Sequence, residues 1–105
     1  MTQKDIVDYL KLNPYNTNVN VGSLEDMNGK DYIFVDYLTE NLIGSDDKGV
    51  YKTSIQLTVA TKDFDKRKQL VNYIQNKFNV DVVYEMHDEY EYYLARCTFE
   101  GILNG

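Results

Sequence analysis

The sequence predicts an α+β two-layer sandwich, in which a mostly antiparallel sheet of about five strands carries two helices on one face. Residues 50–60 alternate apolar and polar side chains, as a half-buried strand does. Residues 63–78 then repeat apolar side chains at helical spacing, which indicates an amphipathic helix. Further strand-like segments flank this pair and give the order α-β-β-β-α-β-β. The strand and the helix can bury their apolar sides only together, so we expect them to form the core of the fold.

The 105 residues are expected to form one domain, residues 1–105, because two independent cores would need a longer chain. No apolar run is long enough to span a bilayer, and the first residues lack the pattern of a signal peptide, so synthesis in a cytoplasm is expected. The net charge of -6 argues against a grip on nucleic-acid phosphates. The 10 tyrosines suit extensive interfaces, although tyrosines also serve as cross-strand partners within sheets.

A first helix is expected over residues 3–11. Thr2 can cap it, and Asp5 stands at the position that completes a capping box. Asn13 and Pro14 then end it, because proline disfavours a helical conformation at the residue before it. A helix this short is marginal in isolation, so its apolar side is expected to dock on the sheet.

Two strands are expected next. Residues 18–24 read as a weak edge strand, and Asn28-Gly29 predicts a type I′ hairpin because both positions of that turn need positive φ. The run 32–38 is apolar on both faces, which is typical of a central strand. Asp36 interrupts this run, and it either has a buried partner or lies on a sheet face that is open to water.

Residues 41–49 form the most loop-like segment, rich in glycine and aspartate, and are expected to be the tip of a long hairpin. Leu42 and Ile43 lie in it without a pattern that would bury them. Two interpretations remain open for this pair. They form part of an interaction surface, or they fold back on the sheet.

The second half of the chain is expected to hold the second helix and a closing hairpin. The apolar stripe of the helix comprises Phe64, Leu70, Val71, Ile74 and Phe78. Residues 80–87 alternate as an amphipathic strand with Val80, Val82, Tyr84 and Met86 on its apolar side. A turn at His87-Asp88-Glu89 leads to a last strand over 92–103.

No catalytic or metal-binding pattern emerges from the sequence. His87 and Cys97 are expected on different faces of the closing hairpin, with Cys97 a small buried hydrophobe and His87 facing solvent. The acidic residues between positions 85 and 91 lack the spacing of a calcium loop, and no glycine-rich phosphate loop exists. We therefore expect no enzyme, no metal and no cofactor.

The whole pattern resembles the tail terminator or tail-completion proteins of long-tailed bacteriophages, a group of neck proteins that also includes head-to-tail joining and minor capsid proteins. The resemblance rests on residues 4–12, 31–60, 63–78 and 92–103, and the run 54–61 that enters the second helix is the most typical part. It implies a virion protein of the tail or neck, made in the bacterial host cytoplasm.

The resemblance further implies a homo-oligomer, commonly a hexameric ring, that caps the tail tube protein and docks to the head completion or stopper protein. DNA would pass through without specific binding, past acidic side chains that repel phosphates. The hairpin tip and the acidic turn are expected to make the contacts between subunits or along the tube. The residues expected there are Leu42, Ile43, Asp46, Asp47, Lys48, His87, Asp88, Glu89 and Tyr90.

A rival hypothesis is a small acidic DNA mimic that inhibits a host nucleic-acid-binding protein. Such a mimic needs carboxylates spaced along one surface like phosphates. Here the acidic residues lie at turns and alternate with basic ones on the second helix, which favours the ring. A subunit of some other assembly, encoded by a host, is a third interpretation.

Overall fold

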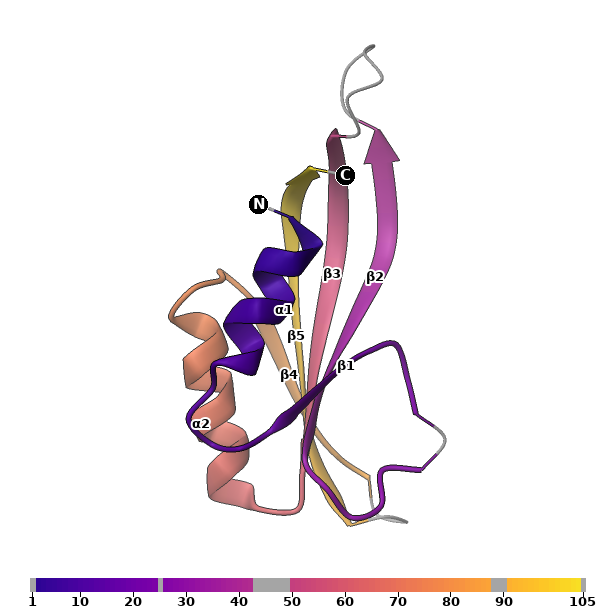
Figure 1. Cartoon of the computed structure of the whole chain (residues 1–105). Coiled ribbons are helices and arrows are strands. Elements are labelled where there is room, and N and C mark those ends of the chain that lie inside the picture. Colours follow the sequence, from indigo (N-terminus) through magenta and orange to yellow (C-terminus); the bar gives the residue numbers. More distant parts are fainter. Residues whose placement is uncertain (1, 25, 43–49, 88–90, 105) are drawn as a thin grey trace.

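A computed structural model describes residues 2–24, 26–42, 50–87 and 91–104 (Figure 1). The elements are α1 (Gln3–Lys11), β1 (Asn18–Val21), β2 (Tyr32–Leu42), β3 (Val50–Thr61), α2 (Phe64–Gln75), β4 (Asp81–His87) and β5 (Tyr92–Asn104). Their sequence along the chain is the one that the residue patterns predict. The α+β class is therefore confirmed.

The strands form one five-stranded sheet in the order β1-β2-β3-β5-β4, so β3 lies at the centre. The pairs β2–β3, β3–β5 and β4–β5 are antiparallel. Both helices lie on the same face of this sheet (Figure 1), and no helix of the described residues lies on the other face. Strand β2, expected to be central, is second from the edge, because β1 lies outside it. β1 has four residues and pairs only with Tyr32 to Val35 of β2, so the rest of β2 has no described neighbour on that side.

The core fills the space between the helices and the sheet. In β3, Ile55, Leu57 and Val59 are fully buried, while Gln56 and Thr58 between them are only partly buried. This alternation confirms the half-buried strand that the sequence predicts. The other buried side chains of the cluster are Ile6, Leu10, Ile33, Val35, Leu70, Val71, Ile74, Phe78, Ala95, Cys97 and Phe99.

The predicted hairpin at Asn28-Gly29 is wrong, because β1 pairs with β2 in parallel, from Asn18↔Tyr32 to Val21↔Val35. Asn28 and Gly29 do have positive φ values of 53° and 72°, as a type I′ turn requires. This turn lies inside the connection 22–31 and does not join two paired strands. The connection instead returns the chain to the end of the sheet where β1 began, as a parallel pair requires.

Helix α1 begins as predicted, with a capping box at Thr2. The Thr2 amide donates to Asp5 Oδ2 at 2.8 Å, and the Asp5 amide donates to Thr2 Oγ1 at 3.2 Å. Ile6 and Leu10, one turn apart, are fully buried against the sheet. The docking that the short helix needs is therefore present.

Candidate functional site

Seven of the nine residues predicted to make contacts lie outside the described residues. Residues 43–48 and 88–90 lie outside them, and Leu42 and His87 are described only as strand backbone. Leu42 pairs with Tyr51 at one end of β2–β3, whereas His87 pairs with Tyr92 at the opposite end of the sheet. The two segments therefore leave opposite ends of the described sheet, and their role in contacts stays a prediction.

The helix-free face of the sheet, called the open face below, is mainly polar. Lys52 Nζ lies 3.3 Å from Glu100 Oε2, and Arg96 Nε lies 3.2 Å from Glu85 Oε2. Asp36 is partly exposed here, opposite Gln56 on β3, which agrees with the interpretation of a face open to water. Exposed aliphatic side chains interrupt the polar ones, namely Leu38, Val83 and Ile102. Such a mixture resembles the wet interfaces that proteins form without a continuous apolar patch.

Asp31 fixes the connection 22–31 to the rest of the molecule. Its carboxylate accepts from Lys66 Nζ at 2.6 Å and from the Lys62 amide at 3.3 Å. Burial alone would raise the pKa of Asp31, but the hydrogen bonds and the charge of Lys66 outweigh it and hold the pKa below its ordinary value. Tyr92, only 6% exposed, donates its hydroxyl to the Lys30 carbonyl at 2.9 Å. The connection 22–31 is thus attached to α2 through Asp31 and to β5 through Lys30.

The sequence did not reveal a cluster of aromatic residues around Arg67. The Arg67 guanidinium lies 5.0 Å, 4.8 Å and 5.5 Å from the ring centroids of Phe64, Tyr84 and Tyr93. Its Nη1 also donates to the carbonyls of two strands, at 3.2 Å on β4 and 3.4 Å on β5. The spacing of Phe64 and Arg67, three residues apart on a helix, was the only available signal.

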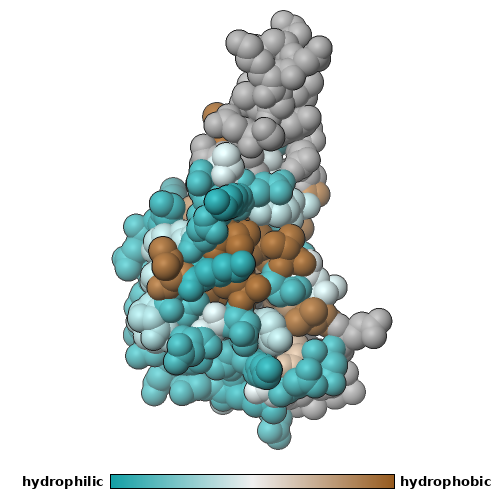
Figure 2. All heavy atoms as spheres, viewed as in Figure 1, coloured by the Kyte–Doolittle hydropathy of each residue, from teal (hydrophilic) through white to brown (hydrophobic). Residues whose placement is uncertain are grey.

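This cluster corrects two expectations. Phe64, assigned to the buried stripe of α2, is 57% exposed, and Tyr84 and Met86, assigned to the apolar side of β4, are 52% and 51% exposed. Phe64 and Tyr84 instead contact the Arg67 guanidinium, and a charged group of this kind stays near water. Figure 2 shows that other hydrophobic residues also gather near the middle of the helix-bearing face, among hydrophilic ones.

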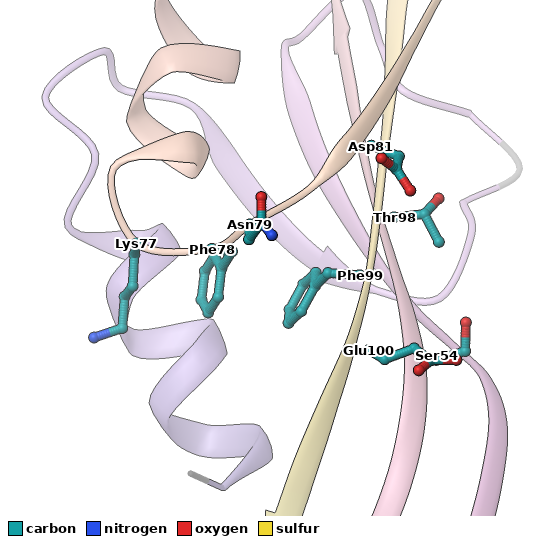
Figure 3. Close-up of a pocket in the computed structure, with 8 residues that line it drawn as sticks. All are labelled: Ser54, Lys77, Phe78, Asn79, Asp81, Thr98, Phe99 and Glu100. Carbon is teal, nitrogen blue, oxygen red and sulfur yellow. The ribbon is translucent and has the colours of Figure 1, made fainter.

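A groove runs along the edge of β5 where β4 begins (Figure 3). β4 pairs with β5 only up to Asp81↔Thr98, and no described strand flanks β5 beyond that pair on this side. The groove encloses about 650 Å³. Its lining comprises Ser54, Lys77, Phe78, Asn79, Asp81, Thr98, Phe99 and Glu100. The rings of Phe78 and Phe99 stack at 4.7 Å with an interplanar angle of 21° and close its helix side.

The described residues hold few groups suited to chemistry. Cys97 is fully buried, and burial raises the pKa of its thiol to about 12, so little thiolate forms at neutral pH. No three His, Cys, Asp or Glu side chains of the described residues come together in a way that could hold a metal ion. Within the same part of the chain, neither helix is long and apolar enough to cross a membrane.

No protein-family model, no curated protein and no solved structure matches the chain. The fold therefore defines the chain as an α+β domain with one open sheet face, and the comparisons add no family to that description.

Proposed function

We propose that the protein is a non-enzymatic structural subunit of the tail or neck of a long-tailed bacteriophage. In this role it forms a homo-oligomeric ring that caps the tail tube and joins it to the head completion complex. One observation supports the proposal most. The described helices cover one face of the sheet only, and its outermost strands, β1 (4 residues) and β4 (7 residues), differ in length and sequence, so that a subunit offers dissimilar surfaces to its two neighbours. A ring needs such a heterologous contact, in which one surface meets another kind of surface.

The two edges differ in shape as well as in sequence. On the β2 side, the ladder between β2 and β3 is irregular between Tyr37 and Thr39, and the edge beyond β1 carries the exposed Leu38. On the β5 side, the ladder with β3 is regular from Thr61↔Tyr93 to Val50↔Asn104. The two sides of the sheet therefore differ from each other, as the two halves of a heterologous contact do.

The two ends of the sheet supply the axial contacts in this proposal. One end carries the connection 43–49 and the other carries the connection 88–90. A subunit between the tail tube and the head completion complex needs contacts at both of its ends. The net charge of -6 would let DNA pass through such a ring without sticking.

The rival role as a DNA mimic is supported less well. A mimic needs a row of unpaired carboxylates that stand in for phosphates. On the open face, Glu85 is paired with Arg96 and Glu100 with Lys52, so cations interrupt the acidic row. This arrangement suits a wet protein contact better than an imitation of a DNA backbone.

Native mass spectrometry over a range of concentrations tests the proposal, with negative-stain electron microscopy of the same samples. The protein is measured alone and with the tail tube protein of the same phage. A ring, either spontaneous or formed on the end of the tube, is expected. A protein that stays monomeric under both conditions would contradict the proposed function.

A deletion tests the hairpin tip within this proposal. Removing residues 42–47 is expected to abolish ring or tube-dependent assembly and to leave the thermal unfolding transition of the monomer in place. The matched control replaces the same residues with glycine and serine at equal length, which keeps the loop but removes its side chains. Unchanged assembly in both variants would show that the side chains of residues 42–47 make no contact that assembly needs.

A further inference from the structure

We infer that the free part of the β5 edge, together with the groove beside it, takes an extended segment of a partner protein with alternating apolar and basic residues. The segment would add to the sheet as a strand in line with β4. This inference names a site and a kind of ligand that ring formation does not require, and it stands whether or not the ring forms.

The first support is the incomplete ladder on β5. Strand β5 pairs with β3 over its whole length, but β4 flanks it only from Tyr92 to Thr98. Beyond Thr98, alternate residues of the segment 99–104 present their backbone amides and carbonyls to that side, and no described strand pairs with them. An edge of this kind is a template for strand addition.

The second support is that this edge lacks the device that protects the other one. The irregularity between Tyr37 and Thr39 bends the free edge of β2, and natural sheets use such bulges to discourage pairing. The β3–β5 ladder has no irregularity from Thr61↔Tyr93 to Val50↔Asn104. An edge with a regular register and an open groove beside it can accept a strand more readily than a bulged edge.

The third support is the two-sided chemistry of the groove. Figure 3 shows the rings of Phe78 and Phe99 on one side of β5, and the carboxylates of Asp81 and Glu100 on the other. Successive side chains of an added strand point to opposite faces, so they would meet the edges of these two largely buried rings and the carboxylates in turn. An alternating apolar and basic segment matches both sides.

The charges around the groove favour the basic partner. Lys77 Nζ lies 5.1 Å from the Tyr9 ring centroid and points away from the two carboxylates (Figure 3). Glu100 contacts Lys52 at 3.3 Å, but both side chains are more than half exposed, so this ion pair is weak and leaves Glu100 open to a second cation. The net charge of -6 attracts a basic segment from a distance.

A second copy of the chain fits this site poorly. Two β5 edges paired with each other would bring Asp81 and Glu100 of both copies onto one face, where the like charges repel. Strand β1 flanks β2 at the same end of the sheet at which β4 flanks β5. A second copy that placed its β2 beside β5, with its sheet in the same orientation, would therefore push its β1 against β4. The partner is therefore expected to be a different chain.

The probe is a short capped peptide that alternates valine and lysine, and its counterpart alternates valine and glutamate. Binding is measured by isothermal titration calorimetry, and amide hydrogen exchange of residues 99–104 is followed by NMR. The valine and lysine peptide is expected to bind and to slow exchange in that segment. The double variant Asp81→Asn, Glu100→Gln, which raises the net charge by two units, is expected to weaken its binding by about tenfold or more.

The control variant is Asp65→Lys, which raises the net charge by the same two units in the first turn of α2, at the end of that helix away from the groove. It is expected to bind the peptide nearly as well as the unchanged protein. Circular dichroism melts check that every variant is folded. Equal loss of binding in Asp65→Lys and in the groove variant would overturn the site, since overall charge would then explain the binding.

Two N-methylated forms of the lysine peptide test whether binding uses backbone hydrogen bonds. Methyl groups on alternate residues block only one edge of an extended strand, and the two forms block opposite edges. One form is expected to bind and the other to fail. Equal binding of both forms would overturn strand addition. Protection of residues 99–104 in a dimer of the protein alone would also overturn the inference, because a second copy would then occupy the edge.

Discussion

Single residues hold the parts of this molecule that have no regular structure, and Asp31 is the clearest case. It joins the connection 22–31 to Lys66 on α2 and to the backbone at Lys62. The side chains of Asp31 and Lys66 are only 22% and 20% exposed, so water screens their attraction less than it screens a surface pair. The pair is therefore expected to contribute more than the exposed ion pairs of this chain.

The substitution Asp31→Asn keeps the shape of the side chain and removes its charge. It is expected to lower the free energy of unfolding by about 1–2 kcal/mol, since a charged hydrogen bond is replaced by a weaker neutral one. Urea unfolding at neutral pH measures the change. The control is Asp8→Asn, which breaks the 3.9 Å pair with the exposed Lys4 and is expected to cost less than about 0.5 kcal/mol.

The same pair predicts a pH dependence. The pKa of Asp31 is lowered in the folded protein, so its contribution is present above the ordinary value of 3.8 and is lost as pH falls through the lowered pKa. The difference in stability between the unchanged protein and Asp31→Asn is therefore expected to shrink below pH 3.8. A difference that stays constant down to strongly acidic pH would show that the charge does not stabilise the fold.

At the scale of elements, a pair of tyrosines joins the two helices. The Tyr9 hydroxyl donates to the Tyr73 carbonyl at 2.6 Å, and the Tyr73 hydroxyl donates to the Tyr9 carbonyl. The two rings stack at a centroid distance of 4.5 Å, and Phe78 meets Tyr9 edge-on. Helix α1 is short and depends on tertiary contacts, so this pair is a main reason that it stays docked.

The substitutions Tyr9→Phe and Tyr73→Phe each remove one of these hydrogen bonds and keep the ring stacking. Each is expected to cost about 1 kcal/mol of the free energy of unfolding. The two losses are expected to be non-additive in the double variant, because the hydroxyls belong to one reciprocal contact. Thermal melts of the four proteins complete the cycle, and strict additivity would contradict the reciprocal arrangement.

Alkaline pH acts on the same contact. Burial raises the pKa of both tyrosines above their ordinary value of 10.0, and the neighbouring Tyr9 adds to the shift of Tyr73. The stabilisation is therefore complete below pH 10.0 and is lost as pH rises through the raised pKa. The double phenylalanine variant is expected to lose less stability than the unchanged protein between pH 9 and 11, measured by urea unfolding around the ordinary tyrosine pKa.

Local signals in the sequence predict the elements well, and long-range signals are missing from it. The capping box at Thr2 and the alternation around Leu57 depend on neighbouring residues, and both are confirmed. Asn28-Gly29 has the predicted backbone conformation, but the partner of a strand depends on where the chain goes next, and β1 pairs in parallel. The environment of Phe64 likewise depends on distant residues, since its ring meets Tyr93 of β5 edge-on at a centroid distance of 5.5 Å.

The interaction surfaces were less predictable than the elements. The Arg67 cluster joins α2, β4 and β5, and the groove joins the end of α2 to β4 and β5, so neither is contiguous in sequence. The predicted contact segments, by contrast, are continuous in sequence and have the composition of loops. Most of their residues lie outside the described part of the chain, so their prediction stands as it was made.

At the scale of the whole molecule, the sheet is held together at its centre by β3 and β5. Cys97 lies in this centre, fully buried opposite Leu57 of β3. It is also the only cysteine of the chain, so the rate of any thiol reaction measures the accessibility of this one position at the centre of the sheet. A reagent can reach its thiol only when the central strands open.

Cys97 therefore provides a probe of global opening. Ellman's reagent is expected to react negligibly with the folded protein at pH 8, because the thiol is inaccessible and burial raises its pKa to about 12. In denaturing urea the reaction is expected to become fast, as for a free thiol. Fast reaction without denaturant would show that the central strands open locally.

The position of β5 also affects how the chain folds. Strand β3 pairs with β5 across an intervening helix and an intervening strand, so the two neighbours at the centre are far apart in sequence. Closing such a loop costs entropy before any contact repays it, which slows folding. Strand β5 lies between β3 and β4 in the sheet, but it is the last strand to be synthesised. β3 and β4 therefore leave the ribosome before the strand that joins them. Until then, the nascent chain exposes the inner edge of β3, and chaperone binding or rapid synthesis of β5 would protect it from aggregation.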